Sequence, residues 1–204
     1  MERLKLHTDK LTPVHGGLFG ILSISIGILC DLLSYLYFPG YNMVDNLVSE
    51  LGVGPGGIFF NIGIVITGIL FIPFYICLGK SFSTEKINPN IKKVAVVSAL
   101  ISSITFSLIG FFPLSEENIL INATHGTLAV IHWIHALISI VIFGILMIQD
   151  DNYTKFQAYY SFAVGLIIIT FFLTQIPLTE WIWTISIVVW ILANSLYMLL
   201  HEYQ

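Results

Sequence analysis

Residues 17–38, GLFGILSISIGILCDLLSYLYF, decide the fold, because they are mostly apolar and contain a single charged side chain, Asp31. About 20 apolar residues in an α-helix cross the hydrocarbon core of a bilayer. Arg3, Lys5 and Lys10 precede this stretch, as basic residues do in a signal peptide. The apolar stretch is too long for a signal peptide, and no small-residue cleavage motif follows it. We therefore predict a retained transmembrane helix.

Five more apolar stretches of similar length follow the first one. Backbone groups in lipid are satisfied only within helices or closed barrels, and the alternating pattern of barrel strands does not occur in this sequence. We therefore predict an all-α polytopic membrane protein, a bundle of six transmembrane helices that forms a single domain over residues 1–204. The predicted spans are residues 17–38, 58–79, 94–113, 126–149, 156–176 and 181–200.

The composition of the chain favours the same fold class. Charged residues make up only 10% of the sequence, whereas about 25% is typical of globular proteins. Eight Lys and Arg residues stand against twelve Asp and Glu residues, which gives a formal net charge of −4. This balance disfavours both a soluble domain and a protein that binds nucleic acid.

The positions of the basic residues predict the orientation of the chain. All of them precede the first span or follow the second and fourth spans. Because Lys and Arg are retained on the cytoplasmic side, we predict a multi-pass protein of the cell membrane with both termini in the cytoplasm. The basic residues are Arg3, Lys5, Lys10, Lys80, Lys86, Lys92, Lys93 and Lys155.

Acidic residues without basic partners occupy the predicted outer face. We expect Glu116, Glu117 and Glu180 to be ordinary solvated side chains, and Asp45 and Glu50 to lie in the first outer loop. An uncompensated negative surface would attract cations, a divalent metal or an amine-bearing headgroup. The outer face therefore disfavours unassisted binding of phosphate anions.

The first outer loop, residues 39–57, is expected to contain a short amphipathic helix that lies across the outer mouth of the bundle. Asn42 is a typical N-cap residue, Asp45 follows it by three positions, and Gly52 is a typical stop. Apolar and polar residues of this segment alternate with the helical period, so they lie on two opposite faces. The apolar face is Val44, Leu47, Val48 and Leu51, and the polar face is Asp45, Asn46, Ser49 and Glu50.

Residues 41–52, YNMVDNLVSELG, resemble the Asn-x-x-Ser-Glu-Leu-Gly signature of DUF998, a prokaryotic six-span family of unknown function. A later Phe112-Pro113 pair followed by His125 is also similar to that family. The family in turn is distantly similar to the DRAM–Frag–Sfk membrane proteins. The resemblance implies a six-span architecture and no established activity. The matching residues of the signature are Asn46, Ser49, Glu50, Leu51 and Gly52.

Polar residues inside the predicted spans are the main candidates for a site. A carboxylate such as Asp31 is costly in a bilayer unless it is partnered, protonated or hydrated. In the fourth span, His125, His132 and His135 share one stripe of the helix. His132 is expected at about the depth of Asp31, so the two side chains can meet if the first and fourth spans are neighbours. The sequence leaves that neighbourhood open.

Three interpretations of the histidines follow. The slightly favoured one is structural: the histidines form hydrogen bonds with Ser102, Ser103, Thr105 and Ser107 of the third span. The second is a site for a divalent metal such as zinc, held by His132 and His135 at i, i+3 with Asp31, or with both Asp31 and Glu50. The third is a proton relay between Asp31 and His132, because histidine titrates near neutral pH.

The best interpretation of function is a non-enzymatic membrane protein that binds a lipid, a sterol-like molecule or a partner membrane subunit in an outward-facing acidic and histidine-lined cavity. One alternative is a metal-dependent membrane hydrolase or lipid-remodelling enzyme in which metal-bound water is the nucleophile. The other is a proton-coupled transporter. The candidate site residues are Asp31, Asp45, Asn46, Ser49, Glu50, His125, His132 and His135.

Overall fold

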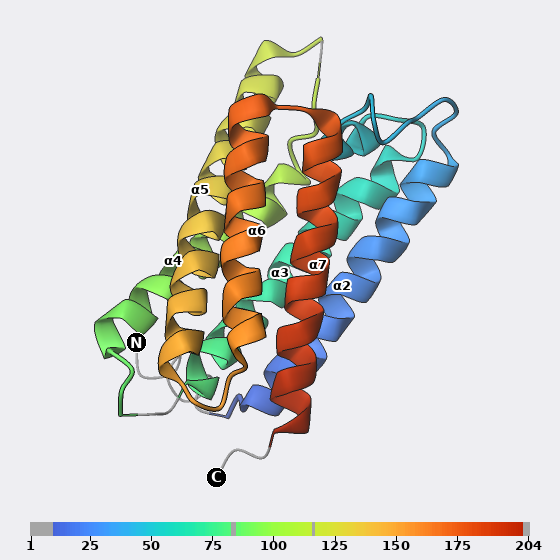
Figure 1. Cartoon of the computed structure of the whole chain (residues 1–204). Coiled ribbons are helices and arrows are strands. Elements are labelled where there is room, and N and C mark those ends of the chain that lie inside the picture. Colours follow the sequence, from blue (N-terminus) through green and yellow to red (C-terminus); the bar gives the residue numbers. More distant parts are fainter. Residues whose placement is uncertain (1–9, 83–84, 116, 202–204) are drawn as a thin grey trace.

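The computed structural model describes residues 10–82, 85–115 and 117–201, and within these ranges all regular structure is helical (Figure 1). Each of the six α-helices is long and apolar enough to cross a membrane. The predicted all-α, six-helix architecture of a multi-pass membrane protein is confirmed. The elements are α2 Pro13–Leu36, the 3₁₀ helix η1 Val48–Gly52, α3 Gly57–Ser81, α4 Pro89–Ile109, α5 Ile119–Gln149, α6 Lys155–Thr174 and α7 Pro177–Leu200.

Several helices begin earlier than the apolar stretches from which they were predicted. The side chain of Asn88 caps α4 by accepting a hydrogen bond from the backbone N–H of Asn90 at 2.9 Å. Asn118 caps α5 in the same way, accepting from Leu120 N at 3.1 Å. Because a capped first turn tolerates polar residues, hydropathy alone places these starts too late.

The six helices form a closed ring. Each one packs against its neighbours in the sequence, and α7 returns to pack against α2 (Figure 1). Within the described chain, α2 and α5 make no contact, because they lie on opposite sides of the ring. The first and fourth spans are therefore not neighbours, so the condition for a contact between Asp31 and His132, which the sequence left open, is not met.

The two ends of the bundle differ in charge and in covering. At the end that we call the basic end, α2 begins and α7 finishes, and this end carries every lysine of the described chain. At the opposite end, which we call the roofed end, residues 37–56 include η1, which contacts α2, α3 and α7. The described lysines are Lys10, Lys80, Lys86, Lys92, Lys93 and Lys155.

Helices α2 and α7 meet at backbone contact near the basic end. A Cβ atom added to Gly17 would lie 2.6 Å from the carbonyl oxygen of Ser195, so only glycine fits at this crossing. Gly16 and Gly20 are similarly enclosed, by Met198 and Cys77 and by Phe74 and Ser195. Small residues at such crossings allow the close van der Waals packing that holds membrane helices together.

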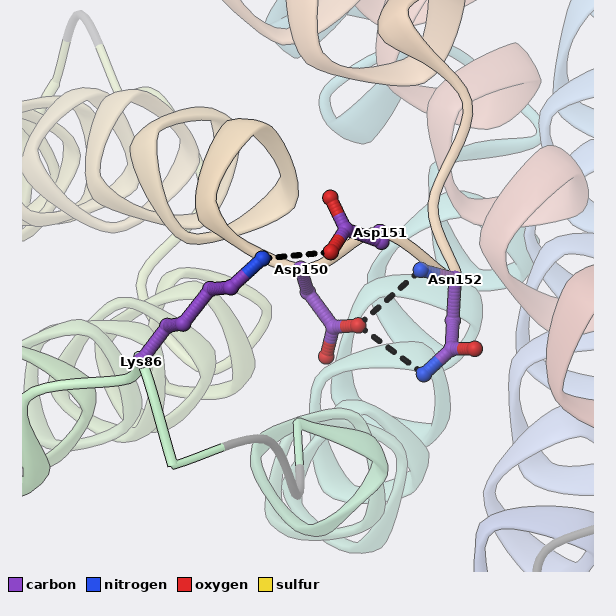
Figure 2. A network of polar contacts seen from close by, with 4 residues as sticks. All are labelled: Lys86, Asp150, Asp151 and Asn152. Atoms are coloured by element: carbon purple, nitrogen blue, oxygen red, sulfur yellow. Dashed lines mark hydrogen bonds and ion pairs between the residues drawn. The ribbon is translucent and has the colours of Figure 1, made fainter.

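Figure 2 shows the two loops that meet at the basic end. Lys86, between α3 and α4, forms an ion pair with Asp151, between α5 and α6. The carboxylate of Asp150 accepts hydrogen bonds from the backbone and side-chain nitrogens of Asn152, at 3.1 and 3.0 Å. These contacts fix the turn that leads from α5 into α6.

Candidate functional site

A cavity of about 490 Å³ lies inside the ring, in the half of the bundle beneath η1. All six helices and η1 contribute to its walls, and most of the lining is aliphatic or aromatic. The volume falls within the range of about 300–1,000 Å³ that is typical of small-molecule sites. Hydroxyl, amide, carboxyl and imidazole groups reach the lining from Asp31, Ser49, Thr67, Tyr75, Ser102, His125, His132, Gln175, Glu180 and Thr184.

The roof over the cavity contains a shorter helix than predicted. Only Val48–Gly52 is helical, as a 3₁₀ turn, whereas residues 43–46 form turns and a bend. The side chain of Asn42 accepts a hydrogen bond from Val44 N, and the backbone N–H of Asn42 donates to Asn46 Oδ1, both at 3.0 Å. These local side-chain bonds compete with helical ones, so Asn42 begins a turn and does not cap a helix.

The signature residues build this roof. Glu50 accepts hydrogen bonds from Asn46 Nδ2 at 2.6 Å and from Leu47 N at 3.1 Å, which together fix the first turn of η1. Leu51 is completely buried, and a Cβ atom on Gly52 would lie 2.8 Å from Asn61 Oδ1. Asn46 and Glu50 therefore stabilise the roof and do not line the cavity; Ser49 of the signature does line it.

Three hydrogen bonds tie the roof to three different helices. Ser34 of α2 donates to the carbonyl of Leu51 at 2.8 Å. Asn61 of α3 donates to the carbonyl of Gly52 at 3.0 Å. From α7, the carboxylate of Glu180 accepts from the backbone N–H of Val48 at 2.8 Å. The roof is thus attached to the walls by polar contacts at separate points.

Tyr41 adds a fourth attachment. The Tyr41 hydroxyl donates to the carbonyl of Leu47 at 2.7 Å and accepts from the indole N–H of Trp181 at 3.0 Å. Burial raises the pKa of the Tyr41 hydroxyl, and the negative charges of Glu180 and Glu50 raise it further, against the opposing effect of the Trp181 hydrogen bond. The hydroxyl therefore stays protonated and keeps donating.

Glu180 corrects the expectation of an ordinary solvated acid. It is only 8% exposed and lines the cavity. The reason is that α7 begins at Pro177, whereas the apolar stretch predicted a start at residue 181. Glu180 therefore lies on the helix and not in the loop before it. Glu180, Thr184 and Val188 recur at the helical spacing, and all line the cavity. This period, together with proline at the first helical position, is the signal that sequence reasoning missed.

The hydrogen bond to the third span that the structural interpretation predicted for His132 is present. His132 Nδ1 lies 2.9 Å from Ser102 Oγ and 3.1 Å from the Ser102 carbonyl, across the α4–α5 contact. Its ring stacks on that of Phe106, with centroids 4.9 Å apart. His125 precedes His132 on α5 and lies nearer the roofed end, with Nδ1 2.8 Å from the carbonyl oxygen of Phe112. Both histidines line the cavity.

The other predicted site residues are dispersed. Asp31 lines the cavity from α2, and no hydrogen bond or ion pair joins it to another described residue. Asp45 lies on the exposed surface of the roof, where it accepts from Asn42 Nδ2 at 2.8 Å. His135 lies outside the lining, and its buried Nδ1 has no partner. Over the described ranges, no three His, Cys, Asp or Glu residues are grouped closely enough to hold a metal ion, so the predicted ligands are not brought together.

A comparison with models of protein families identifies the family of the chain. A family model described as protein of unknown function (DUF998) matches residues 21–197, a range that reaches from α2 into α7 and includes the whole roof. Searches among curated proteins and among solved structures found no match. Because the family model covers most of the chain, the predicted family membership is confirmed. The chain belongs to the DUF998 family, whose function is unknown.

Proposed function

We propose that this protein binds a membrane lipid or a sterol-like amphiphile in the cavity beneath η1. The observation that carries the proposal is the cavity itself, about 490 Å³ in volume, enclosed by six membrane-type helices and lined mainly by apolar side chains. Ligand sites of this kind combine apolar walls with a few polar groups that orient the ligand. A molecule with an apolar body and one polar end matches such a lining.

The hydrogen bonding within the cavity supports binding over catalysis. His132 and Glu180 would be the natural acid–base groups, but each already has a protein partner, Ser102 and Val48 N respectively. The cavity is also formed by the helices of one chain. This supports a small ligand as the occupant in preference to a partner membrane subunit.

We further propose that the protein lies in the cell membrane with the basic end in the cytoplasm. All described lysines gather at that end, as the positive-inside rule requires. In a background without the free cysteines Cys30 and Cys77, a membrane-impermeant maleimide applied to intact cells should label Asp45→Cys and not Lys86→Cys. The reverse labelling pattern would contradict this orientation.

Filling the cavity tests the lipid-binding proposal. Ala129 of α5 is buried and lines the cavity, so Ala129→Phe should displace a bound lipid. Ala123 lies on the same helix but is exposed and outside the lining, which makes Ala123→Phe the matched control. Native mass spectrometry of the purified proteins should detect bound lipid in the wild type and in Ala123→Phe, and not in Ala129→Phe. Equal lipid content in folded samples of all three proteins would refute the proposal.

A further inference from the structure

The Asp, Glu, Lys and Arg side chains that line the cavity are all acidic. Asp31 and Glu180 bring carboxyl groups to the wall, whereas all the lysines of the described chain lie at the basic end, away from the cavity. His125 and His132 are the other titratable groups of the lining besides Tyr75, and each histidine uses Nδ1 in a contact with the protein. The cavity therefore offers counter-charge for a cation and none for a phosphate.

Asp31 is the carboxyl group that the protein leaves without a partner. Glu180 accepts the backbone N–H of Val48, and its carboxylate also lies against the backbone of Ser49. Asp31 has no comparable contact with any described residue, although it lies within α2 among apolar side chains. An ionisable group inside a membrane protein that lacks an internal partner is a typical sign of a ligand or ion site.

The cavity wall beside Asp31 reaches the surface that faces the lipid. Ile28 lies one helical turn from Asp31, borders the cavity and is 49% exposed. Near the basic end, α2 touches α7 through Gly17, and toward the roofed end the two helices diverge (Figure 1). A lipid in the bilayer can therefore approach Asp31 from the side, below the roof.

We propose that the ligand of this cavity is a bilayer lipid with an amine headgroup and no phosphate, and that Asp31 is the counter-charge for the amine. This inference rests on the proposed lipid-binding function and adds the chemistry of the headgroup to it. The apolar chain would lie along the aromatic wall that includes Trp133 and Trp183. In this position the amine and Asp31 would form a pair shielded from water, where charge complementarity gives strong selectivity.

The test uses single-chain probes that share one brominated alkyl chain and differ only in the headgroup, which is an amine, an alcohol or a phosphate. The bromine atoms would quench Trp133 and Trp183, so tryptophan fluorescence of the full chain in neutral nanodiscs reports binding. We expect the wild type to bind the amine at least about tenfold more tightly than the alcohol or the phosphate. Asp31→Asn should bind the amine only as well as the alcohol.

Two further variants control for folding and for general surface charge. Asp31→Glu keeps the charge and should retain the preference for the amine. Asp45→Asn removes an acid from the exposed surface of the roof and should behave as the wild type. If wild type binds the amine and the alcohol equally, or if Asp31→Asn keeps the preference, the headgroup proposal is wrong while lipid binding stands. If no probe quenches the wild type, the lipid-binding proposal fails as well.

Discussion

The half of the bundle near the basic end is solid, whereas the half near the roofed end is hollow, although the same six helices form both. Near the basic end, aromatic rings fill the space between the helices: Phe82 stacks on Tyr153 with centroids 4.7 Å apart, and on Phe143 at 5.9 Å. Beneath η1, the helices enclose about 490 Å³. The solid half therefore supports a half that is free to hold a ligand.

The two halves also depend on different interactions. The solid half is held by close packing, as at the crossing of α2 and α7 at Gly17. The roof also packs through Val48 and Leu51, but it is tied to the walls by separate hydrogen bonds. In these bonds Ser34 and Asn61 donate to the roof and Glu180 accepts from it. Packing energy is spread over many atoms, whereas each hydrogen bond contributes only about 1 kcal/mol of net stability. Mutations in the solid half should therefore lower the free energy of unfolding of the whole protein. Mutations of the hydrogen bonds at the roof should mainly change the local stability of the roof.

The largest difference between the halves is expected from two tryptophans of α7. Trp190 is 1% exposed in the solid half, where its indole N–H donates to Ser161 Oγ at 2.7 Å. Trp190→Ala should lower the free energy of unfolding by about 3–5 kcal/mol, because it opens a new void and leaves Ser161 without this donor. Trp183 already borders the cavity, so Trp183→Ala should cost less. Reversible unfolding in mixed micelles measures both.

The control for this pair is Leu196→Ala, because Leu196 lies on the same helix and is 43% exposed. Its free energy of unfolding should stay close to that of the wild type. Equal losses for Trp190→Ala and Trp183→Ala would mean that the two halves are packed equally well. The distinction between a solid and a hollow half would then be wrong.

A smaller and local effect is expected at the roof. Ser34→Ala removes the donor to the Leu51 carbonyl and should cost about 1 kcal/mol. Because the bond joins η1 to α2, its loss should speed amide hydrogen exchange in Val48–Gly52 and leave exchange at the basic end unchanged. Hydrogen exchange followed by mass spectrometry measures both regions in one experiment.

Ser23→Ala is the matched control for the roof. Ser23 is also a buried serine of α2, but it donates to the carbonyl of Gly20 within its own helix at 2.7 Å. Its replacement should not change exchange in η1. If Ser34→Ala leaves exchange in η1 unchanged, or changes it no more than Ser23→Ala does, then the roof is held by packing, as the solid half is.

The sequence predicted the six helices because crossing a bilayer requires long apolar stretches, and these are visible in one dimension. It also predicted that Asp31, Ser49, His125 and His132 are candidates for a site, and all four line the cavity. It left open whether the spans that carry Asp31 and His132 are neighbours, because the closure of the ring by α7 against α2 is a long-range property. Hydropathy shows that a segment is apolar but does not show which helices become neighbours.

The failures at the roof have a local cause. Residues 42–52 have the pattern of an amphipathic helix, but the side chains of Asn42 and Asn46 form turn hydrogen bonds that compete with helix formation. Glu180 was missed because its segment was judged by apolar content, and a buried acid lowers that content. Polar residues of a functional site therefore lower the hydropathy of the helix on which they lie, and this makes the helix harder to predict from the sequence.

The smallest effect is expected at the surface of the basic end, where Lys86 pairs with Asp151 (Figure 2). The two side chains are 64% and 82% exposed, so water and salt screen their attraction. Asp151→Asn should therefore leave the unfolding midpoint at neutral pH almost unchanged. Glu85→Gln, which removes an exposed acid next to Lys86, serves as a control for charge at the same end.

The pH dependence of this small effect has a defined sign. The hydrogen bond and charge of Lys86 lower the pKa of Asp151 below its ordinary 3.8, so the contribution of Asp151 is present above pH 3.8 and is lost as pH falls through the lowered value. Asp151 raises the pKa of Lys86 above 10.5, so the contribution of Lys86 is present below pH 10.5 and is lost as pH rises through the raised value. Any difference between wild type and Asp151→Asn should therefore be confined to the pH range between these limits and should shrink in salt. A large loss that persists in high salt would mean that the basic end, like the roof, depends on individual polar contacts, and the two halves would no longer differ in what holds them together.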